Sequence, residues 1–437
     1  MSTKTSSIYL TESKKYPIII TIGFFLTFSY IAFFQHTFWF ENDGIYFLKV
    51  GEEFLNGNGW NVKLFDAPPG GPIFFASINS LFDDGFFTLK IISVLSGTGI
   101  VFFSFYVVRN IFSYKIAILS QLLIAFNPRL DFASISALNE LFSVFFIFVS
   151  LYFITKKHLK LFDFIIVGTT LGISFMFRYQ PMLVLIAIVI FLLIHNRKLK
   201  LNLFHISIVI SFFLIVLSPM LFYNFVTFGS FLDTDANLYL LFTTKFQTSE
   251  WHYNMEQLVV SGTDTSGLFN DFDLFLKNYF YNLFYHNSDI IFNFDKLDNL
   301  SITPPIPFLG IIPVLGGFLY SFNIKSIKNT SILLAITAGI TSLFVFLLGD
   351  FSLHFFAIII LPIFVLGLIN ITKIKSNLLP LVILSVVYLL VISISPLYRS
   401  YQLFPMWIII PMMSSIFFLE VIPKIISKIS RNEENES

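Results

Sequence analysis

The chain has 437 residues, of which 56% are hydrophobic and only 12% are Asp, Glu, Lys or Arg. Soluble domains have about 45 to 50% apolar and about 25% charged residues, so this composition excludes a soluble globular protein. The formal net charge of +1 provides no basic excess for nucleic acid, which we do not expect as a partner. The absence of Cys excludes disulfides, thiolate metal sites and Cys nucleophiles.

The apolar residues are gathered in blocks, and the mean hydropathy of the chain is +0.81. Most blocks approach the about 20 residues that cross a hydrocarbon core as a helix. The sequence therefore predicts an all-α, polytopic membrane protein of about twelve transmembrane helices. The first block is too long for a signal-peptide core and is interpreted as a retained span. The expected spans lie near residues 17–38, 86–108, 114–127, 132–154, 161–177, 180–194, 203–223, 307–322, 329–349, 351–369, 377–396 and 402–422.

The basic residues are distributed unevenly between the segments that join these spans. Most of the 27 Lys and Arg residues fall in alternate segments, such as 109–115, 156–160 and 197–200. Cytoplasmic loops are rich in Lys and Arg. We therefore expect a multi-pass plasma-membrane protein with both termini in the cytoplasm.

Two of the outer segments are long, residues 39–85 and residues 224–306. Long loops are uncommon unless they are functional, so the active face is expected to be extracytoplasmic. A Pro-rich run at 303–307 marks the return of the second loop to the membrane. It divides the chain into a seven-span module (1–223), a large extracytoplasmic loop (224–306) and a five-span module with a short cytoplasmic tail (307–437).

Two carboxylates, Glu41 and Asp43, follow the first span directly. Partial burial near hydrocarbon raises the pKa of a carboxylate and makes the ionised form a better proton acceptor. Solvated loop carboxylates are also common, and the local residues do not decide between the two interpretations.

Amphipathic surface helices are predicted in the rest of this first outer loop. Apolar residues recur at helical spacing from Tyr46 to Leu55, and Gly57 and Gly59 end the pattern. A Pro- and Gly-rich turn over residues 68–72 then leads into a second amphipathic helix.

These features together resemble the first outer loop of the GT-C superfamily of membrane glycosyltransferases. The resemblance rests on Asp43, Tyr46, the break at Gly57 and Gly59, and the segment APPGGPIFFASINSLF at 67–82. The superfamily includes the protein O-mannosyltransferases and the bacterial lipid A aminoarabinose transferases. The resemblance implies an all-helical membrane fold that takes a sugar from a polyprenyl-phosphate carrier on the outer side. It also implies that Asp43 is the catalytic carboxylate.

Weaker similarities follow in order along the chain. They are NPRLDFASISALNELFSVFF (127–146), FRYQPMLVL (177–185), YNFVTFGSF (223–231) and HFFAIIILPIFVLGL (354–368). In the last segment His354 stands where the family commonly has Arg. The sequence similarity covers roughly the first 230 residues. Beyond them, only the expected order of spans and loops is similar. Because the chain has no WWDYG motif and no large soluble domain, an N-linking oligosaccharyltransferase is not expected.

The implied reaction needs a base for the acceptor hydroxyl and cations for the departing phosphate. Asp43 is the candidate base, with Glu41 as an alternative or a helper. Arg178, between two short spans, is the first candidate for the phosphate, and Arg399 and His354 are further candidates. The alternative for each of these cations is a structural residue at the membrane interface.

Asp131 and Glu140 are candidates for support of the site. The alternative interpretation of Asp131 is that it pairs with Arg129. The alternative interpretation of Glu140 is that it is protonated and hydrogen-bonded to a neighbouring helix. No residue is assigned as a metal ligand, because the pair Asp233 and Asp235 is a weak signal. A divalent cation remains the alternative partner for the leaving phosphate.

The expected function is transfer of a hexose or pentose from a polyprenyl-phosphate donor to a protein, lipid or glycan acceptor. Membrane lipids are the other expected partners. The alternatives are a multi-span transporter, a lipid-linked glycan flippase, and a polymerase or ligase acting on such glycans. Transporters often show internal repeats and ionisable groups near the midplane. In this chain the two halves look unlike and the charges cluster at the outer ends of the spans, which favours the enzyme.

Overall fold

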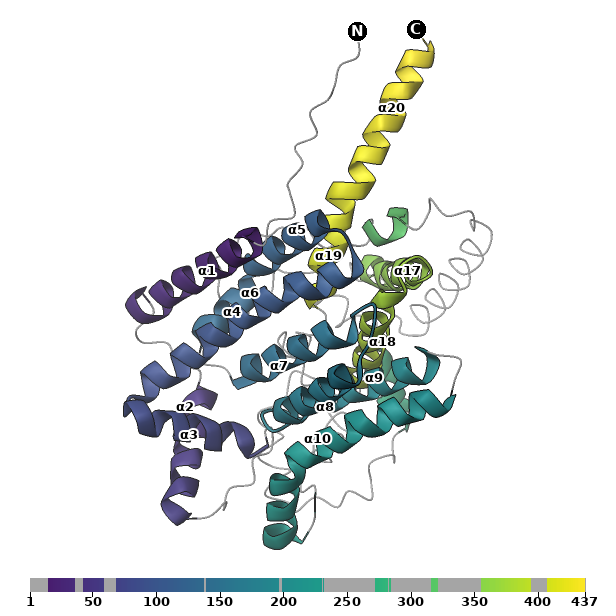
Figure 1. Ribbon diagram of the computed structural model, residues 1–437. Helices are drawn as coiled ribbons and strands as arrows, with labels where there is room; N and C mark the ends of the chain where they lie inside the picture. Colours follow the sequence, from purple (N-terminus) through teal and green to yellow (C-terminus); the bar gives the residue numbers. More distant parts are fainter. Residues whose placement is uncertain are drawn as a thin grey trace.

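The computed structural model describes residues 15–35, 42–58, 68–136, 139–195, 199–229, 231, 272–281, 283, 316–320, 355–393 and 407–436 (Figure 1). These residues form helices and connecting turns and contain no strand. The predicted all-α fold class is confirmed. Glu41, His354, Arg399, the pair Asp233 and Asp235, and most of the loop 224–306 lie outside the described residues.

The N-terminal part of the chain supplies most of the described helices. They are α1 (Lys15–Tyr30), which continues as a π-helical turn (Ile31–Gln35), α2 (Asn42–Glu53) with a second π-helical turn (Phe54–Asn58), α3 (Gly70–Phe82), α4 (Gly85–Ile111), α5 (Tyr114–Ala125), α6 (Pro128–Ile135), α7 (Asn139–Ile154), α8 (Leu161–Phe175), α9 (Pro181–His195) and α10 (Leu199–Phe228). The two amphipathic helices predicted in the first outer loop are α2 and α3, in that order.

The remaining described helices come from the large loop and the C-terminal part. They are α13 (Phe272–Tyr281), α17 (Phe355–Thr372), a 3-10 turn (Ser376–Leu378), α18 (Leu379–Ile392), α19 (Ile409–Ile416), a π-helical turn (Phe417–Val421) and α20 (Ile422–Glu436). In Figure 1, α20 projects from the end of the molecule opposite to α2 and α3.

Four described helical segments are long and apolar enough to cross a membrane. They are Lys15–Gln35, Gly85–Ile111, Leu199–Val226 and Ile409–Ser427. A bent pair, Tyr114–Ala125 with Pro128–Ile135, would make a fifth, and five shorter apolar helices accompany them. These lengths and compositions are those of a polytopic membrane protein, whereas the expected number of twelve spans is not confirmed.

The helices from α5 to α7 differ from the expectation in one of two spans, since the expected span 114–127 agrees with α5. The chain bends by 54° between α5 and α6, and the expected span 132–154 is divided between α6 and α7, which begins at Asn139. Asn127 caps α6 by accepting a hydrogen bond from the backbone N–H of Arg129 (3.0 Å), and Pro128 occupies the first helical turn. Proline fits the start of a helix but not its interior, so α5 ends at this point.

The helices α1, α4, α7, α8 and α10 follow one another across the molecule, each packed against the next (Figure 1). On one side of this row α18 packs against α9, and elsewhere α19 packs against α5. The C-terminal helices therefore share one apolar core with the N-terminal helices. The division into modules at 223 and 307 stays a prediction.

Two glycines on α8 allow α10 to approach closely. A methyl group on Gly168 would lie 2.4 Å from the backbone oxygen of Val209, and one on Gly172 would lie 2.8 Å from Cβ of Val216. Small residues four apart let helix backbones pack together in membranes. The spacing of these glycines is that of the GxxxG pattern, and the helix pair α8–α10 is built on it.

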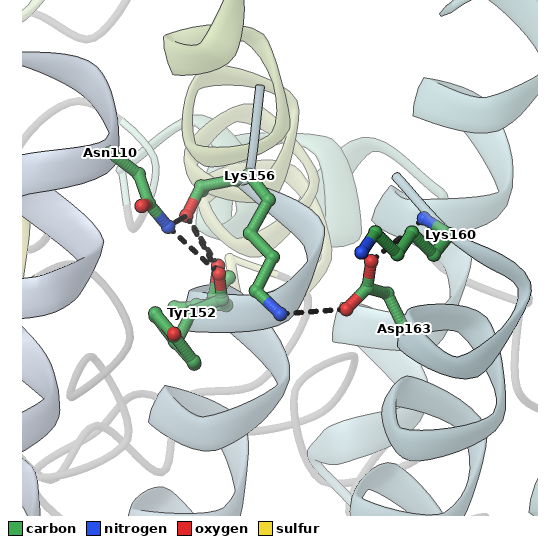
Figure 2. Close-up of polar contacts among 7 residues, drawn as sticks. Asn110, Tyr152, Lys156, Lys160 and Asp163 are labelled. Atoms are coloured by element: carbon green, nitrogen blue, oxygen red, sulfur yellow. Dashed lines mark hydrogen bonds and ion pairs between the residues drawn. The ribbon is translucent and has the colours of Figure 1, made fainter. Parts of the chain in front are cut away.

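The antiparallel pair α7 and α8 is held by an ion pair at its predicted cytoplasmic end (Figure 2). Lys156 Nζ lies 2.7 Å from Asp163 Oδ1, and the backbone N–H of Lys160 donates to Asp163 Oδ2 at 2.7 Å. Asn110, at the end of α4, donates to the backbone oxygen of Tyr152 at 3.0 Å. These contacts fix the ends of α4, α7 and α8 relative to one another.

Candidate active site

The first outer loop forms a compact unit in which α2 crosses α3. A Cβ atom on Gly51 would lie 2.0 Å from the backbone oxygen of Pro72, so only glycine fits at this crossing. Asn79 of α3 donates to Glu52 Oε1 (2.9 Å) and accepts a hydrogen bond from Thr88 of α4 (3.2 Å). The loop is thereby joined to the outer end of α4.

The same loop is docked on the turn between α8 and α9. The backbone N–H of Gly71 donates to the backbone oxygen of Met176 at 3.1 Å. Beneath this contact, aromatic side chains from the loop, from α7 and from the turn form one buried cluster. Within it, Phe142 lies 4.8 Å from Phe74 and 4.5 Å from Phe177, measured between ring centroids. The segment that carries Arg178 is therefore held by the first outer loop.

Arg178 and Glu140 form a buried ion pair at the end of α7 and α8 that faces α2 and α3. Arg178 Nη2 donates to Glu140 Oε1, and the two side chains are 11% and 3% exposed. The guanidinium Cζ also lies 5.8 Å from the ring centroid of Phe47 on α2, within the range of a cation–π interaction. A cation in apolar surroundings is costly unless it is paired, and these contacts compensate it.

Asp43 is the second residue of α2, one helical turn before Phe47. The contact between Phe47 and Arg178 brings α2 to the segment that contains Arg178. Of the sequence-predicted residues, Glu140 and Arg178 are in contact, and the helix that contains Asp43 contacts Arg178 through Phe47.

Asp131 lies apart from this pair, on the short helix α6. Its Oδ1 atom is buried without a hydrogen-bond partner among the described residues, and the structure records no ion pair between Asp131 and Arg129 there. The role of Asp131 in support of the site stays a prediction. Because α6 turns through about 100° per residue, residues two apart point to different sides.

Lys90 is a buried cation that the sequence reasoning did not select. It lies in the outer half of α4 and is fully buried, with its Nζ 5.3 Å from the ring centroid of Phe86. The neighbouring Leu89 belongs to the aromatic cluster under the first outer loop. The sequence does contain a signal for Lys90, because an ionisable residue inside an apolar span is a functional candidate by default.

No group of three or more His, Asp or Glu side chains that could hold a metal ion occurs within the described ranges. The buried carboxylates Asp131, Glu140 and Asp163 lie on three separate helices, α6, α7 and α8. The described side chains thus include two buried cations, Arg178 and Lys90, near the carboxylate-bearing helix α2.

Comparison with known proteins identifies the family that this arrangement resembles. Residues 66–223 match the family model of dolichyl-phosphate-mannose-protein mannosyltransferases. The matched region runs from the second helix of the first outer loop through α10 and contains Asp131, Glu140 and Arg178, whereas Asp43 precedes it. No curated protein sequence matches the chain significantly.

Solved structures of membrane glycosyltransferases are distantly similar. ArnT from Cupriavidus metallidurans bound to undecaprenyl phosphate is 13% identical, with 93% of this chain and 77% of that chain covered and a TM-score of 0.44. The oligosaccharyltransferase AglB from Archaeoglobus fulgidus, in complex with an inhibitory peptide and a dolichol-phosphate, is 12% identical, with 97% of this chain covered and a TM-score of 0.43. The chain spans about half (52%) of the AglB chain. The family-model match confirms, over residues 66–223, the resemblance of this chain to the protein O-mannosyltransferases of the GT-C superfamily.

Proposed function

We propose that the protein transfers a sugar from a polyprenyl-phosphate donor to an acceptor at the extracytoplasmic face of the plasma membrane. The observation that carries this proposal is the match of residues 66–223 to the dolichyl-phosphate-mannose-protein mannosyltransferase family. The description of that family favours a hexose donor and a protein acceptor. Lipid and glycan acceptors, and a pentose, are the alternatives.

In the proposed mechanism Asp43 is the general base. It takes the proton of the acceptor hydroxyl while the acceptor oxygen attacks the anomeric carbon of the sugar. The bond between that carbon and the phosphate oxygen breaks, and its electron pair stays on the lipid phosphate. Glu41, two residues earlier, is the alternative base or a helper.

The departing phosphate needs positive charge, and Arg178 is proposed to provide it. Guanidinium groups bind phosphates through paired hydrogen bonds, and the turn that carries Arg178 is fixed by the first outer loop. Arg399 and His354 are proposed as further phosphate ligands, and Asp131 and Glu140 as support for the site. A divalent cation is the alternative to these side chains.

The direct test is turnover of labelled polyprenyl-phosphate sugars by the purified full chain in detergent or liposomes. Release of free sugar is measured together with transfer, because either shows cleavage of the donor. We expect Asp43→Asn to lower the rate about 10²- to 10⁴-fold, the usual contribution of a general base. Glu53→Gln is the matched control, because Glu53 is an exposed carboxylate on the same helix, and it should keep the wild-type rate.

One result would contradict the transferase assignment, and another would contradict the role of Asp43. If wild-type protein cleaves no donor and instead moves lipid-linked sugars across liposomes, the protein is a transporter or flippase. If Asp43→Asn and Glu53→Gln turn over the donor equally well, the transferase assignment stands and Asp43 is not the base.

A further inference from the structure

We propose that Glu140 is a positioning residue that limits how tightly Arg178 holds the lipid phosphate, so that the product is released. This inference rests on the proposed function. It concerns the buried ion pair between these two side chains. Its consequence is that Glu140 controls product release rather than the chemical step.

The geometry leaves neither partner of this pair free to move far. Glu140 lies in the first turn of α7, and two serines tie this helix to α8, with Ser143 Oγ 2.9 Å from Ser174 Oγ. The backbone N–H of Arg178 donates to the backbone oxygen of Ser174 at 3.2 Å. The guanidinium is also held against Phe47. A phosphate that binds Arg178 therefore approaches the Glu140 carboxylate as well.

The charge of the ligand changes during the reaction, and the fixed carboxylate responds to that change. The donor is a phosphodiester with one negative charge. The product is a phosphomonoester with about 1.5 to 2 negative charges near pH 7. Both are attracted by Arg178 and repelled by Glu140. Because repulsion grows with the charge of the ligand and is strong in a partly buried site, Glu140 weakens binding of the product more than binding of the donor.

The experiment compares wild type with Glu140→Gln, using a donor that the wild-type protein cleaves and the matching polyprenyl phosphate as product inhibitor. We expect the inhibition constant of the polyprenyl phosphate to fall about tenfold, within the usual range of coupling between charged sites. Both KM and kcat should fall, because tighter product binding slows release. A residue with only a structural role would not tighten the binding of product.

The control is Asp163→Asn, which removes the carboxylate of the corresponding ion pair at the other end of α7 and α8. This variant should lower the unfolding temperature while its product inhibition constant stays within about twofold of wild type. Glu140→Asp, which keeps the charge, should also stay near the wild-type constant. If all three variants change product inhibition alike, a loosened helix pair is the cause and the inference fails.

A second comparison covers the case in which Glu140→Gln does not fold because a buried guanidinium has lost its partner. The double variant Arg178→Gln with Glu140→Gln contains neither charge. It should bind polyprenyl phosphate more tightly than Arg178→Gln alone, in which the carboxylate still faces the ligand. Equal or weaker binding by the double variant, or an unchanged inhibition constant in a folded Glu140→Gln, would overturn the inference. If wild-type protein cleaves no donor, the proposed function itself fails.

Discussion

Two cations, Arg178 and Lys90, are buried near the first outer loop. Arg178 has its charge compensated by Glu140 and by the ring of Phe47. Lys90 is fully buried near the ring of Phe86. Both cations lie at the edge of the same aromatic cluster under the first outer loop. A buried cation lowers stability unless it is compensated, so a role of these two side chains in binding the donor phosphate is a proposal to be tested by substitution.

The variant Lys90→Met separates the effect of the Lys90 charge from the effect of the packing of its side chain. Methionine keeps the apolar stem and removes the ammonium group, so the packing of the stem is retained. We therefore expect donor turnover to fall by about tenfold or more, while the unfolding temperature falls less than it does when the stem is removed as well. Thermal unfolding in detergent and the donor-cleavage assay measure the two effects.

Lys90→Ala is the companion variant, because it removes both the stem and the charge. It should lower the unfolding temperature by creating a cavity. A Lys90→Met protein with full turnover would show that the ammonium group is not used in the reaction.

The site residues were predictable from the sequence only in part. Arg178 and Glu140 could be selected separately, because each is an ionisable group at or near the outer end of an apolar block. Their contact could not be foreseen, since 38 residues separate them along the chain. The contact depends on how α7 and α8 pack. The same limitation applies to Asp131 and Arg129, because nearness in the sequence does not show which sides of α6 the two residues occupy.

At the scale of elements, the position of the first outer loop depends on two backbone contacts. One is the crossing of α2 and α3 at Gly51 and Pro72, and the other is the hydrogen bond from Gly71 to Met176. These contacts hold α2 beside the turn that contains Arg178. The proposed base and the proposed phosphate ligand are on different helices, so their relative position is set by helix packing.

The crossing can be tested with Gly51→Ala. The added methyl group would lie 2.0 Å from a backbone oxygen and 2.9 Å from Cβ of Ala76, so α2 has to move away from α3. We expect a loss of about 1 to 3 kcal/mol in stability, the usual cost of overpacking, together with a marked loss of donor turnover. Thermal unfolding and donor cleavage are measured on the same preparation.

Gly23→Ala is the matched control, because Gly23 lies within α1 and a methyl group there meets nothing within 4 Å. Alanine is favoured over glycine inside a helix by about 0.5 to 1 kcal/mol. This variant should be as stable as wild type or more stable, with full turnover. If Gly51→Ala behaves like Gly23→Ala, the crossing does not position α2.

The elements themselves were predictable where hydrophobic blocks are long and uninterrupted. The expected spans 17–38, 86–108 and 203–223 correspond to α1 with its π-helical turn, α4 and α10. The expected span 114–127 agrees with α5 within two residues, whereas the expected span 132–154 is divided between α6 and α7. Its apolar composition gives no sign of the break between these two helices. The first outer loop was predicted well, since its Gly and Pro residues mark the ends of two amphipathic helices.

At the scale of the whole molecule, the proposed active site and the second α7–α8 ion pair lie at opposite ends of the same helices. Glu140 and Arg178 are at the end that faces α2 and α3, and Lys156 and Asp163 are at the other end. The distribution of basic residues predicts that the first end is extracytoplasmic and the second cytoplasmic. Under the proposed function, the polyprenyl-linked donor binds on the side of the membrane on which α2 and α3 lie.

This orientation can be tested by single cysteines, because the natural chain contains none and any labelling comes from the introduced residue. Ser80→Cys places a thiol at an exposed position of α3, and Lys157→Cys places one in the exposed turn between α7 and α8. In intact cells a membrane-impermeant maleimide should label Ser80→Cys and leave Lys157→Cys unlabelled. After the membrane is permeabilised both should react. The reverse pattern would place α2, α3 and Arg178 in the cytoplasm, and the acceptor would then have to be a cytoplasmic molecule.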